Sequence, residues 1–291
     1  MDILELIRLR PLMNMSKGSR DVSIGIIDGP VDLDHPSLSN SKIRTVKQSE
    51  YIKCKGAGST SCIHGTFVTG ILASERGSAA PAICPDCKII LRPIFNDSRD
   101  ETSDGIRYPS STPRELAHAI VEIVDAGARI INLSLGLSSS SITKFSELNE
   151  AYDYAFKRKV IIIAAAGNQG NIGFFPVIDH PWIIPVVSCD MQGRCDPLSN
   201  IGPSIANRGL MAPGINIRST VPGGGYGLLS GTSFAAPFVT GTVVLLLSIF
   251  KGATPAQLVR SVRQQMRRRT IFPPLCNAQK SKELLQHLEL A

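Results

Sequence analysis

Aromatic residues are scarce in this 291-residue sequence, which holds one Trp, five Tyr and ten Phe. The scarcity bears on the basic character of the chain, whose formal net charge is +7. Several arginines gather in one late segment, but no aromatic side chain lies between them on which a nucleic-acid base could stack. We therefore expect no nucleic-acid partner and predict a solvated helix face, with a docking patch for an acidic partner as the alternative. The arginines are Arg260, Arg263, Arg267, Arg268 and Arg269.

The sequence also lacks a recognisable secretion signal and a membrane-spanning segment. Met1 to Arg10 mixes acidic and basic side chains with leucine and isoleucine, so it has no uninterrupted apolar stretch. The longest apolar run, Val239 to Phe250, contains polar residues and is too short to cross a bilayer. We predict a soluble, monomeric, cytoplasmic protein without a membrane partner, or else a processed or excised domain.

No long low-complexity linker and no internal repeat divides the chain. A chain of this length can bury one large hydrophobic core. We expect a single domain over residues 1–291, with a core from about residue 11 to 268 and a tail from about 270 to 291.

The seven cysteines are an odd number, so at least one has no partner within the chain. Cys189 and Cys195 flank a predicted turn and could close a small disulfide loop. Cys54, Cys62 and the two cysteines of the segment Cys84 to Cys87 could instead hold a zinc ion. Free thiols are the third possibility, and the choice depends on the compartment.

Short runs rich in isoleucine and valine recur and are apolar at nearly every position. Such runs predict strands that are covered on both faces, because half-exposed strands alternate apolar and polar residues. Helical patterns lie between them, as in Pro113 to Ala126, where apolar residues recur at helical spacing. This alternation predicts an α/β fold of three layers, a mostly parallel central sheet with helices on both faces. The predicted strands are Val22 to Ile27, Ile89 to Ile94, Ala128 to Leu135, Val160 to Ala165 and Trp182 to Val187, and the other predicted helices are Glu147 to Arg158 and Thr254 to Met266.

A serine stands where a glycine-containing turn enters a long apolar segment. The turn is Gly231 to Pro237, and the apolar run continues from Phe238 to Phe250. The free amides and positive dipole of a helix N-terminus stabilise negative charge near such a serine. By itself Ser233 could be an ordinary helix cap, but its position also suits a nucleophile.

Asp28 and His64 are candidate partners for this serine. A carboxylate directly after a buried strand is costly unless it is paired, so Asp28 is expected to meet a cation or an imidazole. The alternative is a turn aspartate. His64 begins a segment whose small residues permit close packing against another element. A neutral imidazole can take a proton from a serine hydroxyl when a carboxylate fixes its tautomer.

Asn168 follows another predicted strand directly, within the segment Ala164 to Asn168. Its side-chain amide could donate a hydrogen bond to an oxyanion, together with the backbone amide of Ser233. The alternative is an asparagine that merely serves a turn.

In the order Asp, His, Asn, Ser, these residues resemble those of the subtilisin-like serine proteases, or subtilases. The resemblance extends over roughly Pro11 to Arg268. It rests on the segments Ile26 to Gly29, His64 to Thr66, Ile131 to Gly136, Ala165 to Asn168 and Gly231 to Pro237.

The resemblance implies a subtilisin-like fold and a serine endopeptidase that needs no cofactor. Ser233 would be the nucleophile, His64 the general base and then acid, and Asp28 the residue that orients the imidazole. Asn168 would donate to the oxyanion. The implied substrate-binding residues are Ser134, Leu135 and Gly136, which would pair with an extended peptide, and Ala165, Ala166 and Gly167, which would line the pocket for the side chain before the cut.

Two departures from many relatives affect these expectations. The relatives often have an asparagine-rich calcium loop after the helix that holds the histidine, whereas Ser74 to Ala80 offers a single carboxylate. Because Ca²⁺ takes about six or more oxygen ligands, we expect no metal there. Phe234 stands where many relatives have methionine, so we expect the site to tolerate peroxide.

The Asp28 to Asp32 loop, the cysteines and the absence of a signal resemble the subtilases that mature ribosomal peptides, as in cyanobactin pathways. In those pathways one subtilase removes the leader of a precursor peptide, and a sibling with an added helical cap between its Asp and His macrocyclises the core peptide. The short interval between Asp28 and His64 leaves little room for a cap, so we expect water to reach the acyl-enzyme and hydrolysis to follow. The alternatives are a transpeptidase or macrocyclase with the same triad, a general cytoplasmic subtilase, or a catalytically silent peptide-binding module.

Overall fold

The computed structural model describes residues 2–46, 54, 58–95, 111–134, 145–263 and 270–289. Within these ranges one sheet of seven parallel strands has the order β2-β3-β1-β4-β5-β6-β7, and β8 and β9 form a separate antiparallel hairpin. The strands are β1 Ser23–Asp28, β2 Lys42–Thr45, β3 Lys88–Pro93, β4 Ile130–Leu133, β5 Ile161–Ala165, β6 Ile183–Cys189, β7 Leu210–Pro213, β8 Ile217–Val221 and β9 Gly225–Leu229.

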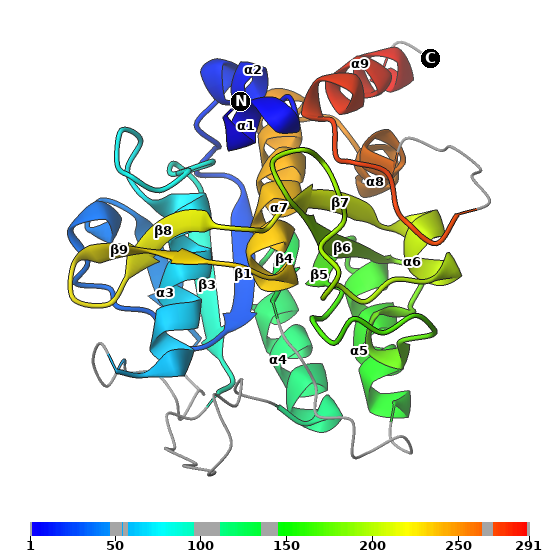
Figure 1. Cartoon of the computed structure of the whole chain (residues 1–291), viewed down its shortest axis with the longest axis horizontal. Coiled ribbons are helices and arrows are strands. Elements are labelled where there is room, and N and C mark those ends of the chain that lie inside the picture. Colours follow the sequence, from blue (N-terminus) through cyan, green and yellow to red (C-terminus); the bar gives the residue numbers. More distant parts are fainter. Residues whose placement is uncertain are drawn as a thin grey trace.

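Helices cover both faces of this sheet, as Figure 1 shows. On β5, Ile161 and Ile163 join the apolar core that includes α3 and α7, whereas Ile162 and Ala164 join the core formed with α4 and α5. Alternate side chains of a strand point to opposite faces, so a strand that is apolar throughout supplies both cores. The predicted three-layer α/β fold is confirmed. The helices are α1 Ile3–Leu6, α2 Arg10–Met15, α3 Thr60–Ala73, α4 Pro113–Asp125, α5 Ser146–Lys157, α6 Pro203–Arg208, α7 Thr232–Ile249, α8 Pro255–Arg263 and α9 Ala278–Glu289.

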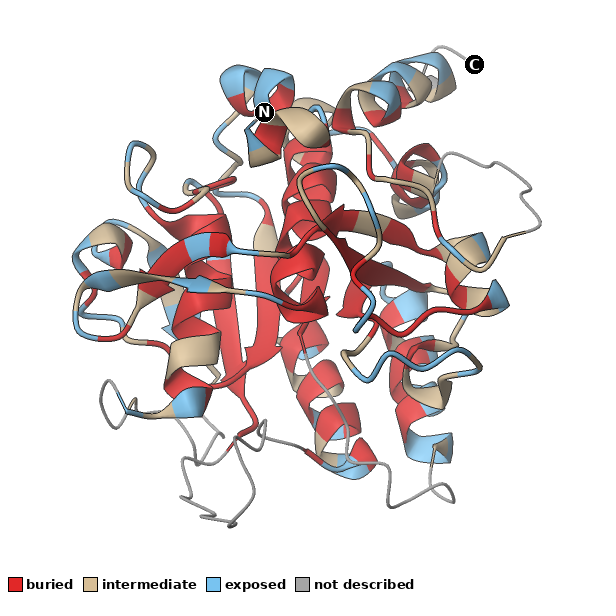
Figure 2. Cartoon of the chain, viewed as in Figure 1, coloured by how far each residue is buried: buried red, intermediate tan, exposed pale blue. Residues whose placement is uncertain are grey.

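Helix α7 crosses the middle of the molecule and is buried over nearly its whole length (Figure 2). Its length and composition alone would allow it to cross a membrane, but in this fold it is a core helix. Pro237 lies in its second turn. The apolar side chains of α7 pack against α3 and the sheet, so the position of its first turn is fixed by the core.

The predicted elements agree with the structure except at some boundaries. Strand β4 begins at Ile130 and not at Ala128, because Gly127 has a φ of +90° and ends a turn just before it. The residue predicted to end this strand, Leu135, lies outside the described residues, as does Met266, the predicted end of α8. Helix α4 begins as predicted at Pro113, where the Thr112 hydroxyl accepts a hydrogen bond from the Glu115 amide.

Both terminal segments pack on the core. Leu4 near the start and Leu285 near the end belong to the same cluster as α7, and the Ala278 amide donates to the Ile7 carbonyl. The two ends of the chain lie on the same side of the molecule (Figure 1).

The prediction of a fully solvated arginine face is wrong for one residue. Arg263 donates to the carbonyls of Pro181 and Ile183 at 2.9 Å. Burial, together with the nearby charge of Arg208, lowers the pKa of Arg263 to about 10. Arg260 is exposed, and Arg267 to Arg269 lie outside the described residues.

Candidate active site

Polar side chains gather where the central strands of the sheet end. Asp28 is the last residue of β1, Ser134 follows β4, and Asn168 follows β5 by three positions. These strands are neighbours in the order β1-β4-β5. Because parallel strands have their carboxyl ends at one edge, the three segments meet there, which is where such sheets place their active sites.

Asp28 and His64 form a close pair at this edge. His64 Nδ1 lies 2.6 Å from Asp28 Oδ1, which also accepts the Gly29 amide at 2.6 Å. The carboxylate is buried, and its other oxygen, Oδ2, has no hydrogen-bond partner among the described residues. Because an ionised carboxylate only accepts, Nδ1 carries the proton of the neutral imidazole and Nε2 is left as the base.

Two glycines allow α3 to approach β1 closely enough for this contact. A Cβ on Gly65 would collide with the Gly29 carbonyl oxygen, and a Cβ on Gly29 would collide with the Ser61 carbonyl oxygen. The pairs Asp28-Gly29 and His64-Gly65 therefore work together: each catalytic candidate is followed by the glycine that lets the two backbones meet.

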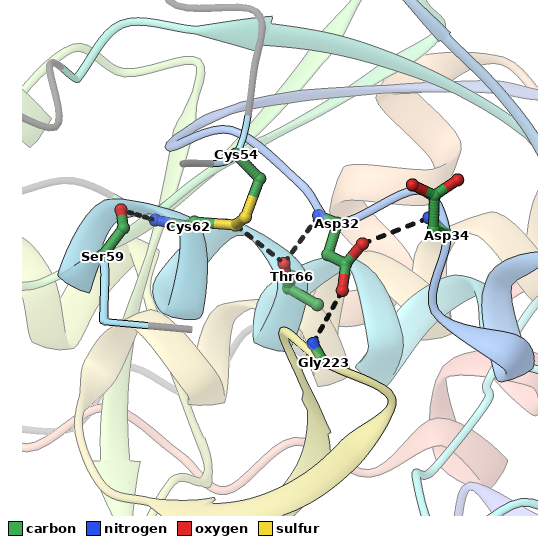
Figure 3. The surroundings of a disulfide bond; sticks show 7 residues. All are labelled: Asp32, Asp34, Cys54, Ser59, Cys62, Thr66 and Gly223. Carbon is green, nitrogen blue, oxygen red and sulfur yellow. Dashed lines mark hydrogen bonds between the residues drawn. A yellow bond between two sulfur atoms is a disulfide. The ribbon is translucent and has the colours of Figure 1, made fainter. Parts of the chain in front are cut away.

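Further bonds connect α3 and the loop after Asp28 with their surroundings, as Figure 3 shows. The Asp32 amide donates to the Thr66 hydroxyl at 2.9 Å, and the Asp32 carboxylate accepts the Gly223 amide at 2.8 Å. A disulfide joins Cys54 to Cys62 in the first turn of the same helix. The Thr66 bond joins the His64 helix to the loop that follows Asp28, and the Gly223 bond joins that loop to the turn between β8 and β9. The disulfide joins the start of α3 to Cys54.

Ser233 lies in the first turn of α7, just after Gly231, which has a φ of +144° and is the N-cap residue. Its hydroxyl is 3.4 Å from the carbonyl oxygen of Ser134, and the structure has no hydrogen bond between it and His64. The next residue, Phe234, packs against the His64 ring with a centroid distance of 5.2 Å. Hydrogen bonds between nucleophile and base are often long or absent before substrate binds, so the triad stays a prediction that this arrangement allows.

The Asn168 side chain is held by the residue before Ser233. Its Oδ1 accepts from the amide of Thr232 at 2.9 Å and from the hydroxyl of Thr232 at 3.0 Å. With Oδ1 engaged twice, Nδ2 is the side-chain group left to donate to a ligand. The Ser233 amide belongs to the first helical turn and has no intrahelical acceptor. Asn168 thus binds the residue that directly precedes Ser233, which brings the two predicted oxyanion donors near each other. Their role in catalysis stays a prediction.

The predicted substrate-binding residues are only partly described. Ser134 is buried against Ser233. Ala165 and Ala166 are buried, and Gly167 follows them with a φ of +98°. Leu135 and Gly136 lie outside the described residues. The predicted pairing with an extended peptide stays a prediction.

Sequence analysis missed three residues that hold this site together. Thr232 orients Asn168. Asn132 and Thr240 are fully buried and bond to each other, although they stand 108 positions apart. A signal was present, because a buried polar side chain within an apolar strand or helix requires a partner, but the sequence does not say which one.

The cysteines form neither the Cys189–Cys195 disulfide nor the four-thiolate zinc site that the sequence allowed. Cys189 and Cys195 face each other across an isolated antiparallel bridge but are free thiols, so of the possibilities that the sequence left open for this pair, the disulfide is wrong. Burial raises the pKa of Cys189 to about 12, which keeps it protonated. A four-thiolate zinc site is also wrong, because the sulfurs of Cys54 and Cys62 are bonded to each other.

This disulfide bears on the compartment. Disulfide bonds are rare in cytosolic proteins, so the Cys54–Cys62 bond counts against the cytoplasmic location, which stays a prediction.

The loop that many relatives use for calcium has a cation of its own here. Arg76 donates from Nε to Ala82 at 3.2 Å, from Nη2 to Ser16 at 2.7 Å and to Ile83 at 2.8 Å, and from Nη1 to Met13, always to carbonyl oxygens. Burial lowers the pKa of Arg76. The four carbonyls belong to the end of α2 and to the segment before β3, not to Ser74–Ala80. The absence of a calcium ion from this loop therefore stays a prediction, which rests on its single carboxylate.

Known proteins are similar to this chain in sequence and in fold. The model of the subtilase family matches residues 19–283, which include all four candidates for the triad and the oxyanion donor. A thermophilic serine proteinase of Bacillus sp. (strain AK1) is 31% identical over 253 residues, which make up 86% of this chain and 58% of that relative. The chain therefore spans little more than half of that relative's length.

Solved structures are also similar. The protease domain of PatA, a patellamide maturation protease, is 30% identical with a TM-score of 0.82, and the match covers 94% of this chain and 98% of that one. The PatG macrocyclase in complex with peptide has a TM-score of 0.83 at 20% identity, covering 98% and 97%. At that identity the PatG likeness shows the fold alone.

Proposed function

The chain belongs to the subtilase family, and on that premise we propose that it is a serine endopeptidase which hydrolyses peptide bonds through an acyl-enzyme on Ser233. The predicted resemblance to subtilases, and to those that mature peptides, is confirmed by the family match and by the likeness to PatA. The roles of individual residues and the choice of substrate are our proposal.

In the proposed reaction, Ser233 Oγ bonds to the carbonyl carbon of the peptide while its proton passes to His64 Nε2. The carbon–nitrogen bond then breaks, and His64 gives the proton to the leaving amine. A water molecule repeats the two steps in the second half, which releases the carboxylic acid and restores Ser233. Asp28 stabilises the imidazolium, and Asn168 Nδ2 with the Ser233 amide stabilises the oxyanion.

The observation that carries this proposal is the 2.6 Å contact between His64 Nδ1 and Asp28 Oδ1. A buried carboxylate that accepts from Nδ1 leaves Nε2 free as a base, and Phe234 keeps the imidazole next to the start of α7. A silent peptide-binding module would gain nothing from a desolvated carboxylate with one unpartnered oxygen, because that arrangement is costly unless a charged imidazole forms beside it.

A fluorophosphonate probe tests the nucleophile. We expect the full chain to be labelled at Ser233, as mapped by peptide mass spectrometry, and Ser233→Ala to lose both label and peptide hydrolysis. Ser230→Ala is the matched control, since Ser230 lies three residues earlier and its hydroxyl accepts the Asn216 amide. Absence of labelling in the folded wild-type protein would favour the binding module.

We further propose that the substrate is an extended precursor peptide whose leader is removed. The support is the likeness to PatA, which is named as a maturation protease. The described residues between Asp28 and the start of α3 form a 3₁₀ turn and strand β2. The absence of a helical cap stays a prediction, because residues 47–53 and 55–57 lie outside the described residues.

Mass spectrometry of products decides between hydrolysis and cyclisation. Incubation of the protein with a leader–core peptide is expected to yield a free leader acid and a linear core. A product that is lighter than the corresponding linear peptide by one water, and that resists exopeptidase, would instead establish macrocyclisation. Ser233→Ala, treated in parallel, accounts for any contaminating protease.

A further inference from the structure

A chain of buried polar groups connects strand β4 to helix α7 beneath the candidate nucleophile. Asn132 is fully buried in a strand that otherwise holds isoleucine and leucine. Its Oδ1 accepts the Thr240 hydroxyl at 2.8 Å, and its Nδ2 donates to the Ser134 hydroxyl at 2.8 Å. Both ends of the amide are thus used, which fixes its orientation.

The chain of bonds continues to the nucleophile residue. The Ser134 hydroxyl donates to the backbone carbonyl of Ser233 at 3.0 Å, while the Ser233 hydroxyl donates to the Ser134 carbonyl at 3.4 Å. Ser134 and Ser233 therefore meet through two contacts. All four residues, from Thr240 through Asn132 and Ser134 to Ser233, are buried.

These bonds reach α7 at two positions on one face, Ser233 and Thr240. Thr240 follows Ser233 by seven positions, which is about two turns of an α-helix. Two contacts on the same face oppose rotation of the helix about its axis as well as sliding along it. An apolar side chain would fill the place of Asn132 without fixing either motion, and burying an amide costs free energy that only its partners offset.

We propose that Asn132 is a positioning residue for the reaction. It fixes the first turn of α7 relative to the end of β4, so that Ser233 faces the bound peptide. The inference rests on the proposed serine endopeptidase function. It adds a role for Asn132 and Thr240, which act through Ser134 and the backbone of Ser233.

Two threonines of α7 provide a matched test. Thr240 and Thr242 are both fully buried, but the Thr242 hydroxyl donates to the Phe238 carbonyl within the same helix, and its other polar contact among the described residues is with the Cys276 sulfur, at 3.9 Å. Thr240→Val and Thr242→Val remove the same hydroxyl from the same helix. Thr240→Ser keeps the hydroxyl that Asn132 needs and loses only a methyl group.

We expect Thr240→Val to lower kcat by about tenfold or more, because small displacements of a reacting group are costly, with a smaller change in KM. Thr240→Ser should restore most of kcat, and Thr242→Val should keep it. Thermal unfolding of all three variants shows whether the losses of stability are similar. The proposal is wrong if Thr240→Val and Thr242→Val retain equal kcat, or if Thr240→Ser is as slow as Thr240→Val.

The rate of fluorophosphonate labelling separates this proposal from the function on which it rests. If the wild-type protein labels at Ser233 and Thr240→Val labels as fast, the positioning role fails while the endopeptidase stands. If the folded wild-type protein neither labels nor cleaves peptides, the proposed function fails. Asn132→Leu, provided that it unfolds cooperatively, should label more slowly than Thr240→Val, since it breaks both bonds of the amide.

Discussion

The two ends of helix α3 use polar groups in opposite ways. Near its start, His64 bonds to Asp28 through one ring nitrogen, and the second carboxylate oxygen of Asp28 is buried without a partner among the described residues. Just beyond its end, every nitrogen of the Arg76 guanidinium donates to a backbone carbonyl. One end leaves an acceptor without a partner in the described part of the chain, and the other engages all three of its nitrogens.

The difference separates a group that reacts from a group that only holds the fold. Buried polar groups are normally satisfied, and an exception requires an explanation. At Asp28 and His64 the explanation is that charge develops there during the proposed reaction, so the site must be able to form stronger bonds later than it has at rest. Arg76 takes no part in the proposed reaction, so its bonds need not change. It joins the C-terminal end of α2 to the loop before β3.

The largest expected effect is at the reacting end. Asp28→Asn should lower kcat by about 10⁴-fold, the loss seen when the corresponding residue of another serine protease fold is changed in this way. The reason is that an amide at this position can donate to Nδ1 and so stabilise the wrong tautomer. Thermal unfolding should change little. Steady-state hydrolysis of a peptide substrate measures kcat, and circular dichroism measures unfolding.

Asp32→Asn is the control for that variant. Asp32 lies four residues later in the same loop, where its carboxylate accepts the amides of Gly223 and Asp34. We expect a modest loss of stability and an unchanged kcat. Comparable loss of kcat in both variants would mean that the loop, and not the Asp28–His64 pair, determines the rate.

The next effect is at the Arg76 end and should appear in the free energy of unfolding. Arg76→Ala leaves four carbonyl oxygens without their donor and should lower the free energy of unfolding by about 2–4 kcal/mol. Arg76→Lys should lose less, because an ammonium still donates but cannot reach all four oxygens. Urea denaturation measures both. A fall in kcat at temperatures where Arg76→Ala remains folded would contradict the division between the two ends.

The smallest expected effect is that of a chelator. Since Ser74 to Ala80 offers a single carboxylate and also carries the Arg76 guanidinium, EDTA should leave the unfolding midpoint of the wild-type protein unchanged. EDTA saturated with Ca²⁺ beforehand controls for ionic strength. A lower midpoint that added Ca²⁺ restores would show that this region depends on metal after all.

Much of the fold could be predicted because its signals are local. The runs from Val160 to Ala165 and from Trp182 to Val187 are short, rich in isoleucine and valine, and apolar at consecutive positions, which is typical of strands buried on both faces. Thr112 and Pro113 specify the start of α4 through a cap and a first-turn proline. Boundaries were less certain, since the turn at Gly127 shortens β4 and nothing in Ala128 itself distinguishes it from a strand residue.

Parts of the site were predictable for a different reason. Asp28 and Asn168 each follow a strand that the sequence already indicated, and parallel neighbours end at one edge. Thr232 was not predicted, although it adjoins Ser233, because its hydroxyl could have served as a cap or faced solvent. Its bonds to Asn168 depend on how β5 and α7 pack.

The sequence by itself determined the α/β layers, the residue types that can perform acyl transfer, and their order along the chain. These follow from periodicity and from residues adjacent to one another, so they need no knowledge of distant contacts. Only the tertiary structure decided that Cys62 pairs with Cys54, that Arg76 binds carbonyls from two separate segments, and that Asn132 meets Thr240. Each of these is a short-range bond between groups whose distance is set by packing of the whole core, and a disulfide or hydrogen bond forms only where that distance allows it.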